Sequence, residues 1–137
     1  MFDTESLREE SERRPPIPRV AFALDYYRHL KKLHDYVLEN PHKPLQLAEI
    51  ASHVGISASR LSRLFHEKTG IPFSLWIRTE RIARAEGLLC GSDMPISEIA
   101  ISVGFNNSRT FERTFKQLRS ITPSDFRKQK QAQQTSH

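Results

Sequence analysis

Apolar residues recur every three or four positions along much of this chain, which is the spacing of a buried stripe on a helix. The first stripe lies between Val20 and Glu39. Its members are Phe22, Tyr26, Leu30, Leu33 and Val37. Asn40-Pro41 follows and predicts the end of this helix, because a residue before proline avoids the helical conformation. No segment alternates apolar and polar residues between hairpin turns, so we expect an all-α protein.

A second pattern occurs twice along the chain. The sequence EIASHVG at 49–55 returns as EIAISVG at 98–104, and LSRLF at 61–65 corresponds to FERTF at 111–115. Each copy predicts a short apolar helix, a turn that contains glycine, and a second helix that begins at a capping residue. The capping residue is Ser57 in the first copy and Asn106 or Asn107 in the second. This order of elements is typical of a helix-turn-helix.

The segment between the two copies, residues 72–90, predicts one long helix. Pro72 suits the first turn, and apolar residues are distributed around the helix that follows. At 1.5 Å per residue this helix is roughly 28 Å long. Thr122 and Pro123 begin a capping signature after the second copy, so a last short helix is expected to end near Gln129. The expected fold has two helix-turn-helix subdomains joined by a long linker helix, about seven helices in all.

This pattern divides the chain into a folded centre, residues 19–128, and two polar ends. The centre comprises a first helix-turn-helix subdomain, a linker helix and a second helix-turn-helix subdomain, at 19–71, 72–90 and 91–128. Residues 1–18 are acidic and proline-rich, and we expect a disordered tail there. Residues 129–137 are expected to form a polar tail.

Charge is unevenly distributed along the chain. The 21 Lys and Arg residues exceed the 16 acidic ones, for a net charge of +5. Residues 1–14 contain five acids and three arginines, which gives −2 there and +7 in the rest of the chain. This basic balance, with a pI near 9.7, points to a polyanionic partner, either nucleic acid or an acidic membrane surface.

Several classes of protein are excluded by composition. No apolar run of about 18 residues could span a bilayer, and the amino-terminal residues contain no secretory signal. A single cysteine, Cys90, permits no internal disulfide and suits a reducing compartment. We therefore expect a soluble cytoplasmic protein that does not associate with membranes.

Metal binding and catalysis have no support in the sequence. The six histidines form no pair at i, i+4 and have no neighbouring cysteine, which predicts no metal site. Cys90 has no basic neighbour that would activate a thiolate. No nucleophile elbow is present. We expect neither an enzyme nor a cofactor.

The second helix of each repeat has one apolar and one polar face. A residue advances about 100° around a helix, so Leu61, Leu64 and Phe65 share the side expected to be buried. Phe111, Phe115 and Leu118 do the same in the second copy. The opposite faces expose equivalent positions, namely Ser59, Ser62, Arg63 and His66 in the first copy and Arg109, Glu112, Arg113 and Lys116 in the second.

These exposed faces fit a surface that reads base edges. A helix-turn-helix inserts its second helix into the major groove, where arginine binds guanine in a bidentate manner and serine reaches several base edges. Phosphates would repel Glu112 unless its carboxylate accepts a hydrogen bond. Two roles satisfy that condition, reading the N4 amino group of cytosine or orienting Arg109 or Arg113.

Two stretches of the chain are specific enough to indicate a family. They are PLQLAEIASHVGISASRLSRLFHEKTGIPFSLWIR at 44–78 and RIARAEGLLCGSDMPISEIAISVGFNNSRTFERTFKQLRSITPSDFRK at 81–128. Through them, residues 33–128 resemble the DNA-binding domain of the AraC/XylS family of bacterial transcription regulators. This resemblance implies seven helices in two subdomains, with two recognition helices that enter successive major grooves. The base-reading positions that it implies are Ser59, Ser62, Arg63, Ser108, Arg109, Glu112 and Arg113.

The chain departs from the family pattern at two positions. Ser120 stands where the family usually has glycine, so a left-handed turn must be made by a residue that tolerates it less well. Gly87 lies inside the linker helix, where glycine costs roughly 1 kcal/mol relative to alanine. Both departures predict a weaker coupling between the two halves.

We therefore expect a monomeric regulator that binds double-stranded DNA, an activator associated with the nucleoid, with RNA polymerase as a candidate second partner. Two rival functions are less favoured. One is a helical adaptor that binds protein through Phe22, Tyr26 and Leu30, against which the presence of Arg63 and Arg113 argues. The other is an accessory domain of an enzyme, against which the absence of catalytic sequence argues. Phe22 and Tyr26 are expected to dock within the chain rather than on a second copy. Whether the chain is complete or part of a longer regulator is left open.

Overall fold

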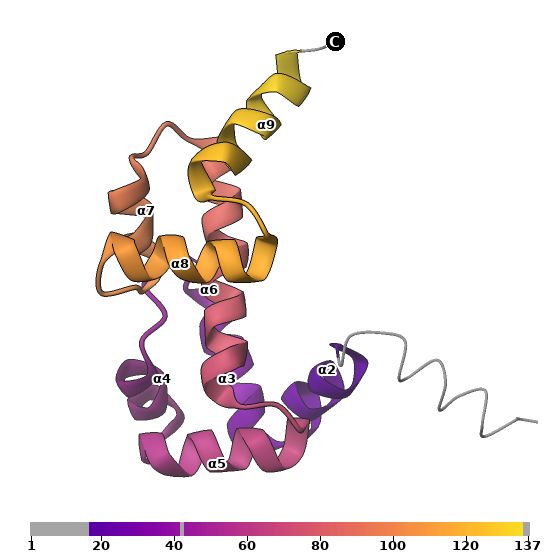
Figure 1. Cartoon of the computed structure of the whole chain (residues 1–137). Helices are drawn as coiled ribbons and strands as arrows, with labels where there is room; N and C mark the ends of the chain where they lie inside the picture. Colours follow the sequence, from indigo (N-terminus) through magenta and orange to yellow (C-terminus); the bar gives the residue numbers. More distant parts are fainter. Residues whose placement is uncertain (1–16, 42, 136–137) are drawn as a thin grey trace, which may run out of the picture.

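The computed structural model describes residues 17–41 and 43–135, and its regular elements are all helices (Figure 1). They are α2 (Ile17–Tyr26), α3 (Arg28–Glu39), α4 (Leu47–Val54), α5 (Ala58–Thr69), α6 (Phe73–Gly91), α7 (Ile96–Val103), α8 (Ser108–Arg119) and α9 (Pro123–Thr135). No strand occurs in the described ranges. The all-α prediction is confirmed, with eight helices in these ranges where about seven were expected.

The apolar side chains form two separate cores, and α6 contributes to both. In its first half, α6 supplies Phe73, Trp76 and Ile77 to the core formed with α2, α3, α4 and α5. In its second half, it supplies Ile82, Ala85 and Leu89 to the core formed with α7, α8 and α9. The long helix is therefore a structural part of each half and not a free spacer between them.

The two helix-turn-helix units are α4–α5 and α7–α8, as the repeat predicts. The backbone N–H of Arg60 donates to Ser57 Oγ at 3.1 Å, and that of Thr110 donates to Asn107 Oδ1 at 2.8 Å. These bonds satisfy amide groups that have no partner within the helix. Of the two candidate caps in the second copy, the structure selects Asn107.

The single helix predicted between Val20 and Glu39 is wrong, because the chain breaks at Tyr27. Tyr27 has φ −88° and ψ 126°, an extended conformation that separates α2 from α3. The break lets α2 fold back so that it packs against both α3 and α5. Apolar spacing gave no sign of the break, since it continues at the same period through Tyr27.

The amino-terminal part of the predicted apolar stripe, in α2, also differs from the structure. Leu30, Leu33 and Val37 are buried as expected. In α2 the buried residues are Val20, Ala23 and Leu24, whereas Phe22 is 62% exposed. The expectation that Phe22 docks within the chain is therefore wrong, and the helix docks through a different face. The side chain of Tyr26 lies outside the described residues.

The chain ends are more helical than the polar composition suggested. Ile17 and Pro18 belong to α2, and proline suits this first turn because its missing N–H would have no partner there. The remainder of the expected disordered tail lies outside the described residues. At the other end α9 continues to Thr135, beyond the predicted end near Gln129. Residues 129–135 are mostly good helix formers without an apolar stripe, so periodicity could not detect them.

The helices α5 and α8 are each followed by a residue in the left-handed conformation, which is glycine after α5 and serine after α8. The residue after α5 is Gly70, with φ 81°, and the residue after α8 is Ser120, with φ 69°. Ser120 is the only residue other than glycine with positive φ in the described part of the chain. The side chain of an L-residue costs roughly 1–2 kcal/mol in this conformation.

We predict that Ser120→Gly raises the free energy of unfolding by about 1 kcal/mol, because glycine removes this strain. The reverse change at the equivalent position, Gly70→Ser, is expected to lower it by a similar amount. Urea denaturation followed by circular dichroism measures both. A destabilised Ser120→Gly variant would show that the serine side chain contributes more than the strain costs.

Candidate nucleic-acid interface

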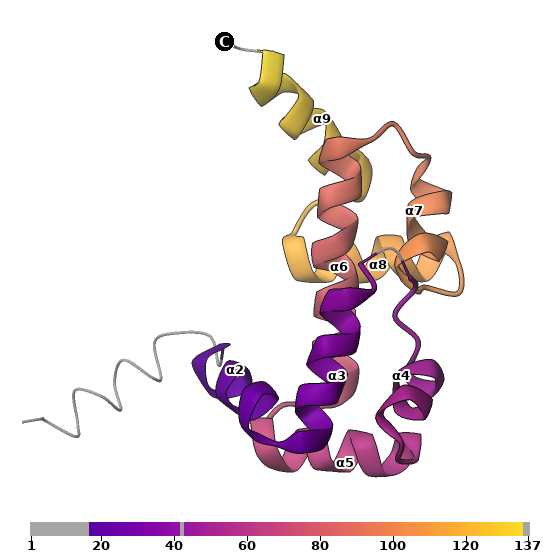
Figure 2. The same ribbon diagram turned by 180° about the vertical axis from the view of Figure 1, so that it is seen from behind.

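The helices α5 and α8 both cross the long helix α6 and run in the same direction. Each begins on the side where the preceding helix of its unit, α4 or α7, is located (Figures 1 and 2). Because α6 contributes to both cores, these crossings are fixed at two levels along one helix. The second helices of the repeat therefore present their beginnings on one side of the molecule.

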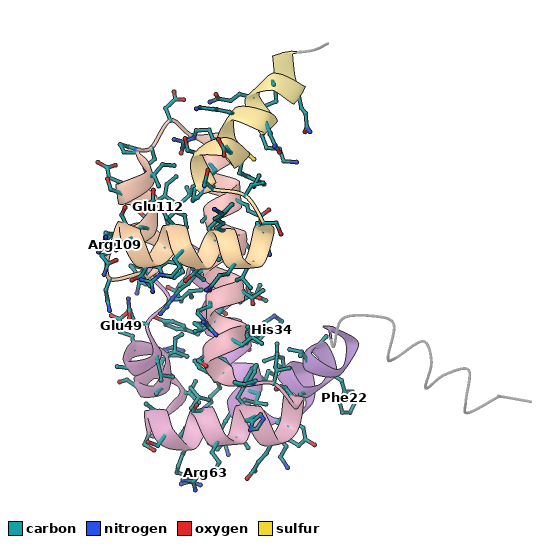
Figure 3. All side chains as sticks on the ribbon, viewed as in Figure 1. Phe22, His34, Glu49, Arg63, Arg109 and Glu112 are labelled. Carbon is teal, nitrogen blue, oxygen red and sulfur yellow. The ribbon has the colours of Figure 1, made fainter. Side chains whose placement is uncertain are left out.

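The four polar positions predicted in α5 gather around one groove. Ser59, Arg63 and His66 are exposed, and Ser62 is half-buried. All four line a groove of about 410 Å³, which continues to the beginning of α6. Figure 3 shows Arg63 on the outer side of α5, directed away from α6. The structure thus brings together hydroxyl, imidazole and guanidinium groups along one helix surface.

The predicted positions in α8 form a second polar surface. Arg109, Glu112, Arg113 and Lys116 are exposed, whereas Ser108 at the first position is half-buried. Figure 3 shows Arg109 and Glu112 near the beginning of the helix. No ion pair joins Glu112 to either arginine in the described part of the chain. Its carboxylate is therefore not committed to orienting them.

A network of hydrogen bonds connects the two halves beside these helices. The backbone N–H of Leu45, just before α4, donates to the carbonyl of Val103 at 3.2 Å. Gln46 Nε2 donates to the carbonyl of Gly104 at 2.7 Å. From α6, the guanidinium of Arg81 donates through Nε (2.9 Å) and Nη2 to the carbonyl of Leu45. We call these contacts the inter-half brace.

The brace explains why glycine stands at position 104. A Cβ there would lie 2.8 Å from the carbonyl oxygen of Leu45 and 2.9 Å from its amide nitrogen. Gly55, at the equivalent turn of the first unit, would meet nothing within 4 Å. Both glycines have positive φ, but only Gly104 is also required by the close approach of another backbone segment.

Other arginines anchor helix ends to α6. Arg84 donates to the carbonyls of Val37, Asn40 and Lys43 at 2.6 to 3.2 Å, which satisfies groups at the end of α3. Arg119, the last residue of α8, pairs with Glu86 of α6 at 2.6 Å. Burial lowers the pKa of Arg81 and of Arg84 from the usual value of arginine, because the charged form loses hydration.

A basic cavity lies beside the brace and was not predicted from the sequence. It has a volume of about 500 Å³, and Arg78, Arg81 and Arg113 contribute to its walls together with Thr110. The signal in the sequence was the spacing of arginines three apart on α6, at 78, 81 and 84. All the site residues expected from the sequence lie on the second helices of the repeat, so this contribution from α6 was not predicted.

The described ranges of the chain contain neither a membrane-spanning helix nor a cluster of metal-ligating side chains. No helix there has the length and apolar character needed to cross a membrane. No group of three or more histidine, cysteine or acidic side chains there could hold a metal ion.

Comparison with known proteins gives a family match over most of this structure. A family model described as a helix-turn-helix domain matches residues 50–129. Regulatory protein PocR of Salmonella typhimurium (strain LT2) is 36% identical over 100 residues, which are 73% of this chain and 33% of that protein. The chain therefore spans about a third of the length of this curated relative.

Solved structures agree with the fold. A transcriptional regulator with an AraC-type DNA-binding domain, from Chromobacterium violaceum, superposes with a TM-score of 0.61 at 30% identity, over 74% of this chain and 91% of that one. The DNA-binding domain of AdpA, in complex with a target DNA, gives a TM-score of 0.65 at 23% identity, over 78% and 96%. At that identity the second likeness concerns the fold alone.

We predict that Arg81→Met lowers the free energy of unfolding by about 1–3 kcal/mol, because the buried carbonyl of Leu45 loses a charged donor while the aliphatic stem is kept. Arg78→Met is the matched control, since exposed Arg78 donates only to Ser74 within its own helix. Urea denaturation gives both values. Equal effects of the two changes would contradict a specific role for the brace.

Proposed function

The chain belongs to the AraC-type family of helix-turn-helix DNA-binding domains, and from that premise we propose that it is a sequence-specific regulator of transcription that binds double-stranded DNA. In this proposal α5 and α8 enter successive major grooves of one duplex. The observation that carries it is the parallel placement of both helices on one α6. The AdpA domain, which has the same fold, was solved with DNA.

The dimensions of α6 support the insertion of both helices. Its 19 residues correspond to a length of about 28 Å. Successive major grooves on one face of B-DNA are about 34–36 Å apart. In Figure 1, α5 lies at the beginning of α6 and α8 crosses α6 further along, so the two helices are separated along the axis of α6, on the order of the spacing between grooves. One chain carries both helices, so we propose that it binds as a monomer to an asymmetric site of about two turns.

Base reading is assigned to the exposed positions of the two helices. In α5 these are Ser59, Ser62, Arg63 and His66, which line one groove. In α8 they are Ser108, Arg109, Glu112, Arg113 and Lys116. Arginine suits guanine because its guanidinium bonds O6 and N7 together. Glu112 suits cytosine, because its carboxylate has no ion pair with the neighbouring arginines and can accept from the N4 amino group.

The basic cavity beside the brace supplies a contact to the DNA backbone. Arg78 and Arg113 line it from α6 and α8, in the region that lies between the two reading helices. A duplex that follows both helices presents phosphates there, and phosphate contacts fix register without reading sequence. We assign Arg78 to this role, which adds one residue to those named from the sequence.

The remaining parts of the proposal concern the cellular setting. We propose that the chain acts by binding rather than by catalysis and needs no cofactor. Its expected place is the cytoplasm, at the nucleoid, where it activates transcription with RNA polymerase as the protein partner. The relative PocR, which is named a regulatory protein, supports the regulatory role.

We predict that Arg63→Ala and Arg113→Ala each weaken binding to a site selected from random DNA by about 10- to 100-fold, because each loses a bidentate contact to one base. Binding to a scrambled duplex is expected to change little. Fluorescence anisotropy at fixed salt measures both affinities. An equal loss on selected and scrambled DNA would refute base reading by that arginine.

Lys32→Ala serves as the charge-matched control for these two variants. Lys32 is exposed on α3, and α3 lies on the opposite side of α6 from α8 (Figure 2). Its loss lowers the net charge by the same unit but should leave affinity for the selected site within about twofold. If Lys32→Ala lowered the affinity as much as the arginine variants do, their effect would come from the overall charge of the protein and not from base reading.

Salt dependence separates this function from that of a protein-binding adaptor. A chain that contacts about six or seven phosphates should show a slope of about −6 when log affinity is plotted against log salt concentration. Titrations between low and physiological salt measure the slope. Weak binding with no dependence on salt would favour the adaptor.

A further inference from the structure

A second cavity lies on the other side of the first core, away from the beginnings of α5 and α8. It has a volume of about 520 Å³ and is enclosed by α2, α3 and the first half of α6. Most of its wall is apolar, with Leu24, Val37, Leu75 and Trp76 among the lining residues. Cavities of about 300–1,000 Å³ with apolar walls and a few polar groups are typical of small-molecule sites.

The polar part of the wall consists of two ionisable side chains, Glu80 and His34, together with Thr79. Figure 3 shows His34 in the space between α6 and α2, whereas Phe22 projects from the outer side of α2. Within the described ranges the carboxylate of Glu80 has neither an ion pair nor a hydrogen bond. A half-buried carboxylate beside an apolar wall is costly unless a partner offsets its lost hydration.

Arg84, whose charge acts on Glu80, forms no ion pair with it among the described residues. The Nη1 and Nη2 groups of Arg84 donate instead to the carbonyls of Val37, Asn40 and Lys43. Burial raises the pKa of Glu80, while the charges of Arg84 and His34 act in the opposite direction. Burial outweighs these two charges, so the surroundings on balance disfavour the charged form of Glu80, and a cation bound beside the carboxylate would offset its lost hydration.

We propose that this cavity binds a small molecule with an apolar body and one protonated amine, the amine pairing with Glu80 and the body filling the space between α2 and α6. The chemistry follows from charge complementarity, since Glu80 is the one acidic side chain among the described residues that line this mostly apolar cavity, where His34 and Thr79 are the other polar residues. Such a ligand contacts α2, α3, α6 and Ile71, which follows the end of α5. Its binding stabilises the first core and is independent of the DNA-binding proposal.

Trp76 allows the proposal to be tested directly, because it is the single tryptophan of the chain and lines the cavity. Three probes of nearly the same shape are used: para-tert-butylbenzylamine, the corresponding benzyl alcohol and the corresponding benzoate. Titration of the full chain, followed by Trp76 fluorescence and by amide chemical shifts in α2 and α3, should show the amine binding about tenfold more tightly than the alcohol. The benzoate should bind most weakly.

Two variants define the site. Glu80→Gln keeps the shape of the side chain and should make the amine and the alcohol bind equally, whereas Glu98→Gln, an exposed acid on α7, should leave the preference unchanged. Ala21→Phe fills the cavity from an exposed position on α2 and should abolish binding of all three probes. Thermal melts confirm that each variant is folded.

Several results would overturn the proposal. Benzoate binding as tight as that of the amine would show that the site selects anions. If the Glu80→Gln variant still bound the amine more tightly than the alcohol, Glu80 would not be the group that pairs with the amine. An absence of any spectral change at millimolar probe, or unchanged binding to Ala21→Phe, would show that the cavity takes no such ligand.

Discussion

The inter-half brace is the constraint on which the placement of the two polar helices depends. Each half has its own core, so apolar packing alone fixes the helices only relative to α6. Arg81, bonded to the carbonyl of Leu45, and Gly104, bonded through Gln46, join the segment before α4 to the turn before α8. Packing on α6 places α5 and α8, and this direct contact between the halves adds a second link that resists any change in their relative orientation.

The same side chains show how the fold uses arginine. Arg81, Arg84 and Arg119 lie on α6 or pack against it, and each satisfies polar groups of another segment. The two or three hydrogen bonds that each guanidinium donates offset the free-energy cost of removing its charge from water. Among the described residues, Arg78 and Arg113 line the basic cavity without hydrogen bonds to other segments, so their charges are available to the DNA in the proposed complex, Arg78 to a phosphate and Arg113 to a base.

Much of this arrangement could be predicted from the sequence. The repeat identified both helix-turn-helix units, and helical geometry identified the exposed faces of α5 and α8, because both depend only on local spacing. The brace could not be found in this way, since its hydrogen bonds join residues 36 and 58 positions apart and use backbone oxygens. The break at Tyr27 and the extension of α9 were missed because the first depends on tertiary packing and the second has no apolar stripe.

The central claim is that one rigid chain reads two major grooves at a fixed spacing. The most direct test selects bound sites from random DNA and then inserts one to five base pairs between the two contacted segments. Five base pairs turn one segment by about half a helical turn, so the account predicts that affinity falls about 100-fold, to that of a single segment. Affinity that stays within about twofold at every spacing would show that the halves bind independently and would contradict the account.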